Sequence, residues 1–126
     1  MAKRNQLENP VYTEMEEKLN EVGNGMCLAK WTQVTLQLQT GHNHSCHHPR
    51  THKINTKEIA RNPSALHNTQ YKKLRRREML TGKRPEECDY CWNVEDNSDR
   101  FSDRTFKSSE SWSKPHFDEI VNADWR

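Results

Sequence analysis

The sequence predicts a small α+β domain stapled by a metal, with a β-hairpin, one long helix and a Cys-x-x-Cys knuckle. Three observations predict this class. In residues 31–40, apolar or threonine side chains alternate with mostly glutamine side chains, which is the pattern of a half-buried strand. Residues 64–81 carry a narrow apolar stripe at helical spacing. Apolar residues make up 31% of the 126 residues and charged residues 30%, so the core needs a metal, disulfides or a partner to hold the fold.

The first element is a short polar helix over residues 11–22. Its apolar side chains follow one another at spacings of three and four, and Gly23 ends it. These side chains are Val11, Met15, Leu19 and Val22.

The next element is the alternating segment over residues 31–40, which is predicted to be one strand of a hairpin. Val34, Leu36 and Leu38 point to one face, and glutamines point to the other. The turn at Gly41 sends the chain back into a short strand through Ser45 and Cys46, with a positive φ expected at the glycine. The hairpin therefore spans residues 31–47.

Two helices follow the hairpin. Thr56 to Arg61 form one helical turn that Asn62-Pro63 closes, because a residue before proline leaves the helical region. Ser64 is the expected N-cap of the long helix, which Gly82 and Pro85 end. Five basic residues on this helix are read as a solvated face rather than a nucleic-acid site: Lys72, Lys73, Arg75, Arg76 and Arg77.

The net charge and the absence of a long apolar run limit the kinds of partner that the sequence predicts. A net charge of +2 is too small to indicate nucleic acid, and no apolar run is long enough to cross a bilayer. The N-terminus lacks the apolar segment of a secretory signal. We therefore expect a cytoplasmic protein without a membrane partner. In that compartment disulfides are disfavoured, so the cysteines are more often metal ligands or redox-active groups.

The four cysteines are the candidate metal ligands. Thirteen residues separate Cys27 from Gly41 and four separate Gly41 from Cys46, so a hairpin brings this pair together. Cys88 and Cys91 form a Cys-x-x-Cys pair that follows the long helix, and this helix is expected to place the pair beside the other two cysteines. Because this pair follows a helix instead of opening one, a thioredoxin-like role is disfavoured. Four thiolates suit a zinc ion or a [4Fe-4S] cluster, and the sequence does not separate the two.

Histidines crowd the hairpin turn. One of them could bind zinc or donate a hydrogen bond to a cluster, but a solvated polar loop is the simpler interpretation. The five are His42, His44, His47, His48 and His52.

At the cysteines the chain resembles a known family. Cys27, the strand, Gly41 and Cys46 are similar to the C-x(n)-G-x4-C start of SPASM and twitch domains, which are auxiliary iron–sulfur domains of radical SAM enzymes. The stretch from Leu74 to Cys91, with its R-x-x-M-L-x-G helix end before P-x-x-C-x-x-C, resembles phage-type members. Glu95, Asp96 and the run 98–100 extend the likeness. It covers about residues 26–104.

The resemblance implies a [4Fe-4S] cluster on Cys27, Cys46, Cys88 and Cys91, beside a radical SAM catalytic domain in cis or in trans, with a peptide or other substrate. The chain lacks the Cys-x3-Cys-x-x-Cys motif of the catalytic cluster. No complete catalytic site is therefore expected in this chain. It would be either a truncated or split part of a longer enzyme, phage-encoded as the resemblance implies, or a stand-alone descendant of one. The alternative is a structural zinc module for protein or nucleic-acid interaction.

The domain boundaries follow from these assignments. Residues 1–25 form an N-terminal polar helix and linker, residues 26–104 the four-cysteine domain, and residues 105–126 a tail that could begin a missing domain. From about Asn97 onward the five aromatics lack a periodic stripe, so we expect this part of the chain to be mobile until Trp112 and Trp125 anchor it on a partner. The alternative is that these aromatics fold back over the exposed side of the hairpin.

Overall fold

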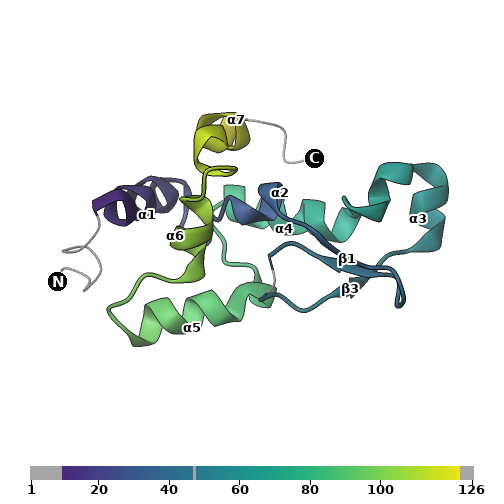
Figure 1. The fold of residues 1–126 in the computed structure, drawn as a ribbon, viewed down its shortest axis with the longest axis horizontal. Coiled ribbons are helices and arrows are strands. Elements are labelled where there is room, and N and C mark those ends of the chain that lie inside the picture. The colour runs from purple at the N-terminus through teal and green to yellow at the C-terminus, as the bar shows by residue number, and fades with distance from the viewer. Residues whose placement is uncertain (1–9, 47, 123–126) are drawn as a thin grey trace.

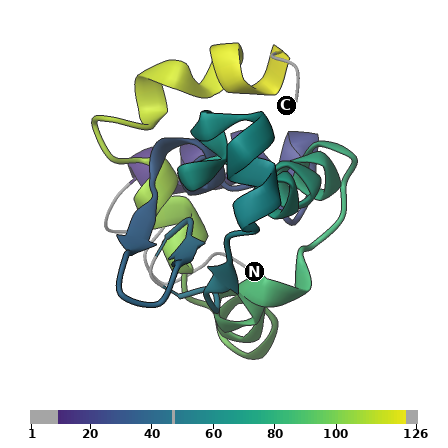
Figure 2. The same cartoon turned by 90° about the vertical axis from the view of Figure 1, so that its right-hand side faces the viewer.

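Helices and a small antiparallel sheet make up the fold, as the α+β prediction requires. The computed structural model describes residues 10–46 and 48–122. The sheet and α3 lie at one end of the long axis, α1 and α6 lie at the other, and α4 runs between them (Figure 1). The two views agree that α5 and α7 lie on opposite sides of the molecule (Figure 2). In chain order the elements are α1 (Pro10–Val22), α2 (Ala29–Thr32), β1 (Thr35–Gln37), β2 (His42–His44), β3 (His52–Lys53), α3 (Thr56–Arg61), η2 (Pro63–Leu66), α4 (Gln70–Leu80), η3 (Glu86–Cys88), α5 (Asp89–Asn97), α6 (Asp103–Ser108), η4 (Lys114–His116) and α7 (Phe117–Asn122).

The predicted first helix is confirmed as α1, which buries Met15 and Leu19. These two side chains join a core cluster that also takes in Met79 from α4 and Phe117 and Ile120 from α7. Residues near both ends of the described chain therefore share one core. The expectation that the aromatics after Asn97 lack a partner within the chain is wrong for Phe101, Phe106 and Phe117. Trp125 lies outside the described residues.

A second group of aromatic side chains joins α1 to α6. The Tyr12 ring packs edge-on against Phe106, with ring centroids 4.8 Å apart, and against Phe101 at 6.0 Å. Phe101 is buried. These contacts, like those of Phe117, are long-range and leave no periodic signal in the local sequence.

The prediction of one strand over residues 31–40 is wrong in extent. Trp31 lies in the helical turn α2, and β1 keeps only three residues. Val34, Leu36 and Leu38 are exposed, Leu38 at 72%. The chain coils earlier because Leu28, Ala29 and Lys30 are all buried, and tertiary packing of this kind overrides a local alternating pattern.

The hairpin itself is confirmed, with its second strand earlier than predicted. β1 pairs antiparallel with β2, with Gln37 opposite His42, and Gly41 has a φ of +70°. Ser45 and Cys46 lie beyond β2. A third strand, β3, pairs antiparallel with β2 and was not predicted.

The predicted helix over residues 56–61 is confirmed as α3, with Asn55 as its cap. The predicted helix over residues 64–81 is instead two elements, because the chain leaves η2 at His67 and starts again at α4. Thr69, and not Ser64, caps α4, since its hydroxyl accepts from the Lys72 N–H at 3.2 Å. None of the helices among the described residues has the length and apolar run needed to cross a bilayer.

Candidate metal centre

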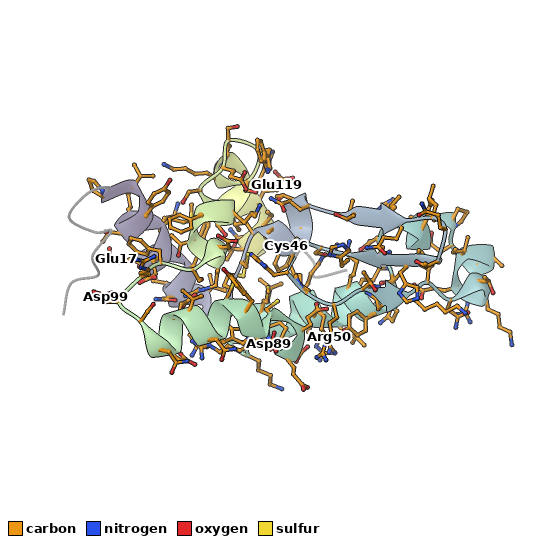
Figure 3. The ribbon with its side chains drawn as sticks, turned by 60° about the horizontal axis from the view of Figure 1, so that its bottom comes forward. Glu17, Cys46, Arg50, Asp89, Asp99 and Glu119 are labelled. Atoms are coloured by element: carbon orange, nitrogen blue, oxygen red, sulfur yellow. The ribbon has the colours of Figure 1, made fainter. Side chains whose placement is uncertain are left out.

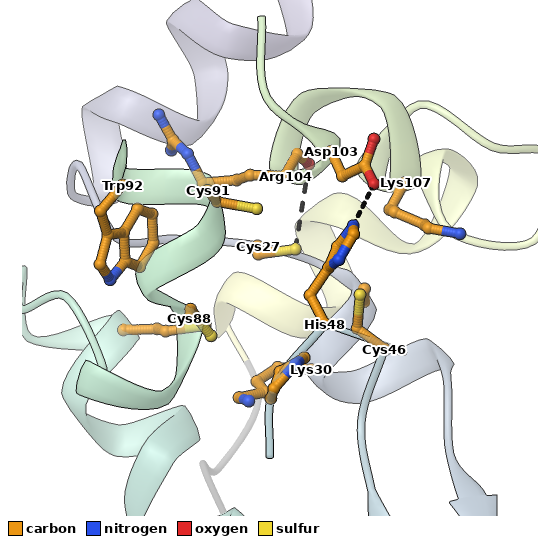
Figure 4. A pocket seen from close by; sticks show the side chains of 13 residues that line it. Cys27, Lys30, Cys46, His48, Cys88, Cys91, Trp92, Asp103, Arg104 and Lys107 are labelled. Carbon is orange, nitrogen blue, oxygen red and sulfur yellow. Dashed lines mark hydrogen bonds and ion pairs between the residues drawn. The ribbon is translucent and has the colours of Figure 1, made fainter. Parts of the chain in front are cut away.

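One cavity is lined by all four cysteines of the chain. Cys27 comes from the turn before α2, Cys46 from the loop after β2, Cys88 from the end of η3, and Cys91 from the first turn of α5. Their sulfur atoms turn toward a common space (Figure 4), and all four are free thiols. The cavity holds about 390 Å³ of empty space, counting its opening to solvent. The structure thus brings together the four residues that the sequence predicted.

Cys46 lies where the sheet meets the helical part of the molecule (Figure 3). Its φ is +59°, and it is the one non-glycine residue with a positive φ in the described part of the chain. A side chain in this left-handed region costs about 1–2 kcal/mol. Strain of this kind persists where the surrounding structure fixes the residue, and it gathers at functional sites.

Cys27 is fixed by contacts with α6. Its thiol lies 3.9 Å from the carbonyl oxygen of Arg104, to which it donates, and the Ser108 hydroxyl lies 3.8 Å from the same sulfur. The turn before Cys27 touches the loop before Cys88. A Cβ on Gly25 would lie 2.2 Å from the carbonyl oxygen of Lys83. Only glycine allows this approach, which brings the two cysteine-bearing segments together.

Cys88 and Cys91 lie on helical backbone, so the predicted knuckle is not found. Cys88 ends η3 and Cys91 lies in the first turn of α5. The Trp92 indole donates to the carbonyl oxygen of Pro85 at 2.8 Å and holds this turn in place. The argument that the pair does not open a helix is therefore wrong.

The acid strength of the thiols still distinguishes this pair from a redox-active dithiol. Burial raises the pKa of Cys88 to about 12 and that of Cys91 to about 11. Burial also raises the pKa of Cys27. Nucleophilic cysteines of redox enzymes have a lowered pKa, because the thiolate is the reactive form. Buried thiols of this kind ionise only when a cation replaces their protons.

Positive side chains stand against the cavity. Lys30 lines it and is buried, and its ammonium group pairs with the Glu87 carboxylate. Tyr71 also donates to Glu87, at 3.2 Å. Arg104 lines the cavity too, and its guanidinium pairs with Glu95 at 2.8 Å. The sequence predicted no such role for any of these five residues, since ordinary polar residues carry no motif.

Two of the five basic residues on α4 are buried, so the prediction of a wholly solvated face is wrong. Lys72 is 2% exposed and Arg76 is 7% exposed. The Arg76 guanidinium donates to the carbonyl oxygen of Lys30 at 3.0 Å, and the Lys72 ammonium donates to the His67 carbonyl oxygen at 2.8 Å. Burial, with Arg76 and Lys30 nearby, lowers the pKa of Lys72 to about 8.

Of the predicted histidines, His48 lines the cavity. It pairs with Asp103 and stacks on Tyr90, with ring centroids 3.9 Å apart. His42 bonds Thr51 at 2.9 Å, and His52 bonds Thr69 at 2.6 Å, so both are tied into the sheet and its neighbours. His44 is buried in β2, and His47 lies outside the described residues.

The four thiols surround the cavity without closing on one point. Across residues 10–46 and 48–122, no three His, Cys, Asp or Glu side chains are grouped closely enough to hold a single metal ion. The comparisons with known proteins add no assignment, because no family model, curated protein or solved structure matches the chain.

Proposed function

We propose that Cys27, Cys46, Cys88 and Cys91 hold a [4Fe-4S] cluster, and that the chain is an auxiliary module of a radical SAM enzyme. The observation that carries the proposal is the convergence of four free thiols, from separate segments, on one cavity (Figure 4). Four thiolates are the ligand set of such clusters. The donor set therefore fits the group that the resemblance implies.

The charge around the cavity supports a bound tetrathiolate. Lys30, Lys72 and Arg76 are buried close together, and the Glu87 carboxylate pairs with Lys30. Lys72 and Arg76 donate to carbonyl oxygens instead. Buried charges are costly unless they are paired. A doubly charged metal centre on four thiolates carries a net charge of about −2, so it offsets the excess positive charge.

The space between the thiols favours a cluster over a single zinc ion. Zinc–sulfur bonds of about 2.3 Å in a tetrahedron place sulfur atoms about 3.8 Å apart. In a cubane cluster each thiolate binds a different iron, so its sulfur atoms stay farther apart. Among the described residues no three donor side chains are grouped closely enough for one metal ion, and this spacing suits the larger group.

The auxiliary role follows from the cysteine count. All four cysteines of the chain line this one cavity, so none remains for a cluster that cleaves S-adenosylmethionine. That chemistry is assigned to a catalytic domain in cis or in trans.

When bound, the cluster supplies one-electron transfer or an anchoring point for a peptide or other substrate. His48 and Asp103 stand at the partly exposed side of the cavity, their side chains 17% and 31% exposed, so this side is open to a partner. A reducing cytoplasm suits free thiols and clusters.

Reconstitution of the full chain with iron and sulfide under anaerobic conditions tests the proposal. We expect brown protein with thiolate-to-iron absorption, and loss of that absorption in each Cys→Ser variant. His48→Asn is the matched control, because His48 lines the cavity but supplies no thiol, and it should keep the cluster. Retention of the cluster in Cys46→Ser and Cys91→Ser, or exclusive uptake of zinc by the wild type, would overturn the assignment.

A further inference from the structure

A second hollow lies between α2 and the segment that leads into α7. Its lining shares no residue with the cavity of the four thiols, and it holds about 700 Å³ of empty space counting its open mouth. The lining residues are Trp31, Thr32, Trp112, His116, Glu119 and Ile120. We call this hollow the indole cleft.

Hydrogen bonds fix the two walls of the indole cleft relative to each other. The Leu28 N–H donates to the Ser108 hydroxyl at 3.0 Å, and the Thr32 hydroxyl lies 2.6 Å from the Ser113 hydroxyl. Gln33 donates to Glu110 at 3.1 Å. Ser113 is fully buried, so its hydrogen bond to Thr32 holds the turn that carries Trp112 against α2. The cleft is formed before any ligand arrives.

Two indole rings and one carboxylate give the cleft its chemistry. Trp112 is 55% exposed, although a tryptophan side chain is largely apolar. Trp31 packs its other side against the core cluster, which fixes its ring. The Glu119 side chain is 77% exposed, and the lining includes neither lysine nor arginine. Indole faces and a carboxylate both attract positive charge.

The remaining polar groups of the cleft are already engaged. The Thr32 hydroxyl donates to the Leu28 carbonyl oxygen at 3.2 Å and also meets Ser113. A sugar, which needs several free hydrogen-bonding groups, is therefore poorly matched. His116 pairs with Glu119 at 3.1 Å, but both side chains are mostly exposed, and such surface pairs are weak. A stronger cation can replace the imidazole.

We propose that the indole cleft binds an organic cation of the ammonium class between Trp31, Trp112 and Glu119. This site is independent of the thiol cavity, so it holds whether or not the cluster assignment does. The ammonium group sits against the indole faces, and Glu119 balances its charge.

Titration of the full chain with choline tests this site, with 3,3-dimethylbutanol as the neutral analogue of equal shape. The readout is the set of tryptophan indole N–H signals in nitrogen–proton NMR spectra. We expect choline to shift the Trp31 and Trp112 signals, leave that of buried Trp92 unchanged, and bind about 10-fold more tightly than the alcohol. A lysine with blocked ends reports whether a peptide side chain can supply the cation.

Variants on the exposed side of the cleft keep the test independent of folding. Trp112→Ala should weaken choline binding about 10-fold and Glu119→Gln about 3-fold, whereas His116→Ala should strengthen it by freeing the carboxylate. Unchanged melting curves establish that each variant is folded. Equal binding of choline and the alcohol, tighter binding of methyl glucoside than of choline, or no effect of Glu119→Gln would overturn the proposal.

Discussion

At the scale of single residues, the sequence predicted which cysteines are the candidate metal ligands. It did not predict which side chains surround each thiol. Cys27, Cys46, Cys88 and Cys91 were predicted together because thiols at such spacings are metal ligands. Lys30 and Arg104, which stand beside them, come from segments without any motif. Their burial depends on long-range packing, which no local pattern encodes.

Cys46 allows its backbone and its thiol to be tested separately. Asparagine tolerates a positive φ and valine does not. In the metal-free protein, we expect Cys46→Asn to match the wild-type free energy of unfolding within about 0.5 kcal/mol, and Cys46→Val to lose about 1–2 kcal/mol. Urea unfolding measures both. Neither variant should load a metal, and equal losses for the two would show that strain at this φ is unimportant.

The raised pKa values predict how metal binding depends on pH. Cys27, Cys88 and Cys91 are protonated in the metal-free fold at neutral pH, so metal must displace at least these three protons. The apparent zinc association constant should therefore rise at least about 1,000-fold per pH unit between about pH 6 and 8. Competition with a chelator measures it. In Cys91→Ser the rise per pH unit should be about tenfold smaller than in the wild type, and a slope near zero would mean that the thiols are not the ligands.

The raised thiol pKa values also affect the stability of the metal-free protein. This stability falls as the pH rises, whereas metal affinity increases. Burial raises the pKa of Cys88 to about 12 and that of Cys91 to about 11, above the ordinary thiol pKa of 9.0. The stabilisation from these groups is complete below about pH 9 and is lost as the pH rises through their folded pKa values.

At the scale of elements, the sequence located helices with clear ends and misjudged the strand. α1 and α3 were found because Gly23 and Asn62-Pro63 stop them. The segment 31–40 alternates, yet burial of Leu28 and Ala29 coils its start into α2. α4 begins at Thr69 and not at Ser64, and both residue types cap helices, so local chemistry alone could not choose between them.

Gly41 controls the hairpin that leads to Cys46. Its φ of +70° lies in the left-handed region, and a Cβ there would meet no neighbour within 4 Å. The penalty in Gly41→Val is therefore backbone strain, which we expect to lower the free energy of unfolding by about 1–2 kcal/mol and to reduce metal occupancy. Gly41→Asn should cost less, because asparagine adopts this region. Thermal melting and metal content check both, and full occupancy in Gly41→Val would show that the turn does not position Cys46.

Gly25 controls the approach of the turn before Cys27 to the loop that precedes Cys88. In Gly25→Ala, the new Cβ would press on the backbone of Lys83 and Arg84. Overpacking of this kind costs about 1–3 kcal/mol, and metal affinity should fall with it. Chemical unfolding and zinc titration measure the two effects. Asn24→Ala, at the exposed neighbouring position, is the control and should leave both unchanged.

At the scale of the whole molecule, one core joins α1, α4 and α7, and the thiol cavity lies where three separate parts of the chain meet. The sequence indicated a small core that needs a staple, but it could not show that Phe117 and Ile120 complete that core. A site whose ligands are distant in the chain must couple metal binding to folding, with apparent energies of about 10–16 kcal/mol for structural zinc.

The central claim is that the cavity holds a four-iron cluster on four thiolates. The most direct measurement is metal and acid-labile sulfide analysis of the full chain purified without oxygen, alongside Cys91→Ser purified in the same way. We expect about four iron and about four sulfide per wild-type chain, and loss of both in the variant. Colourless wild-type protein with one zinc per chain and no sulfide would contradict the account.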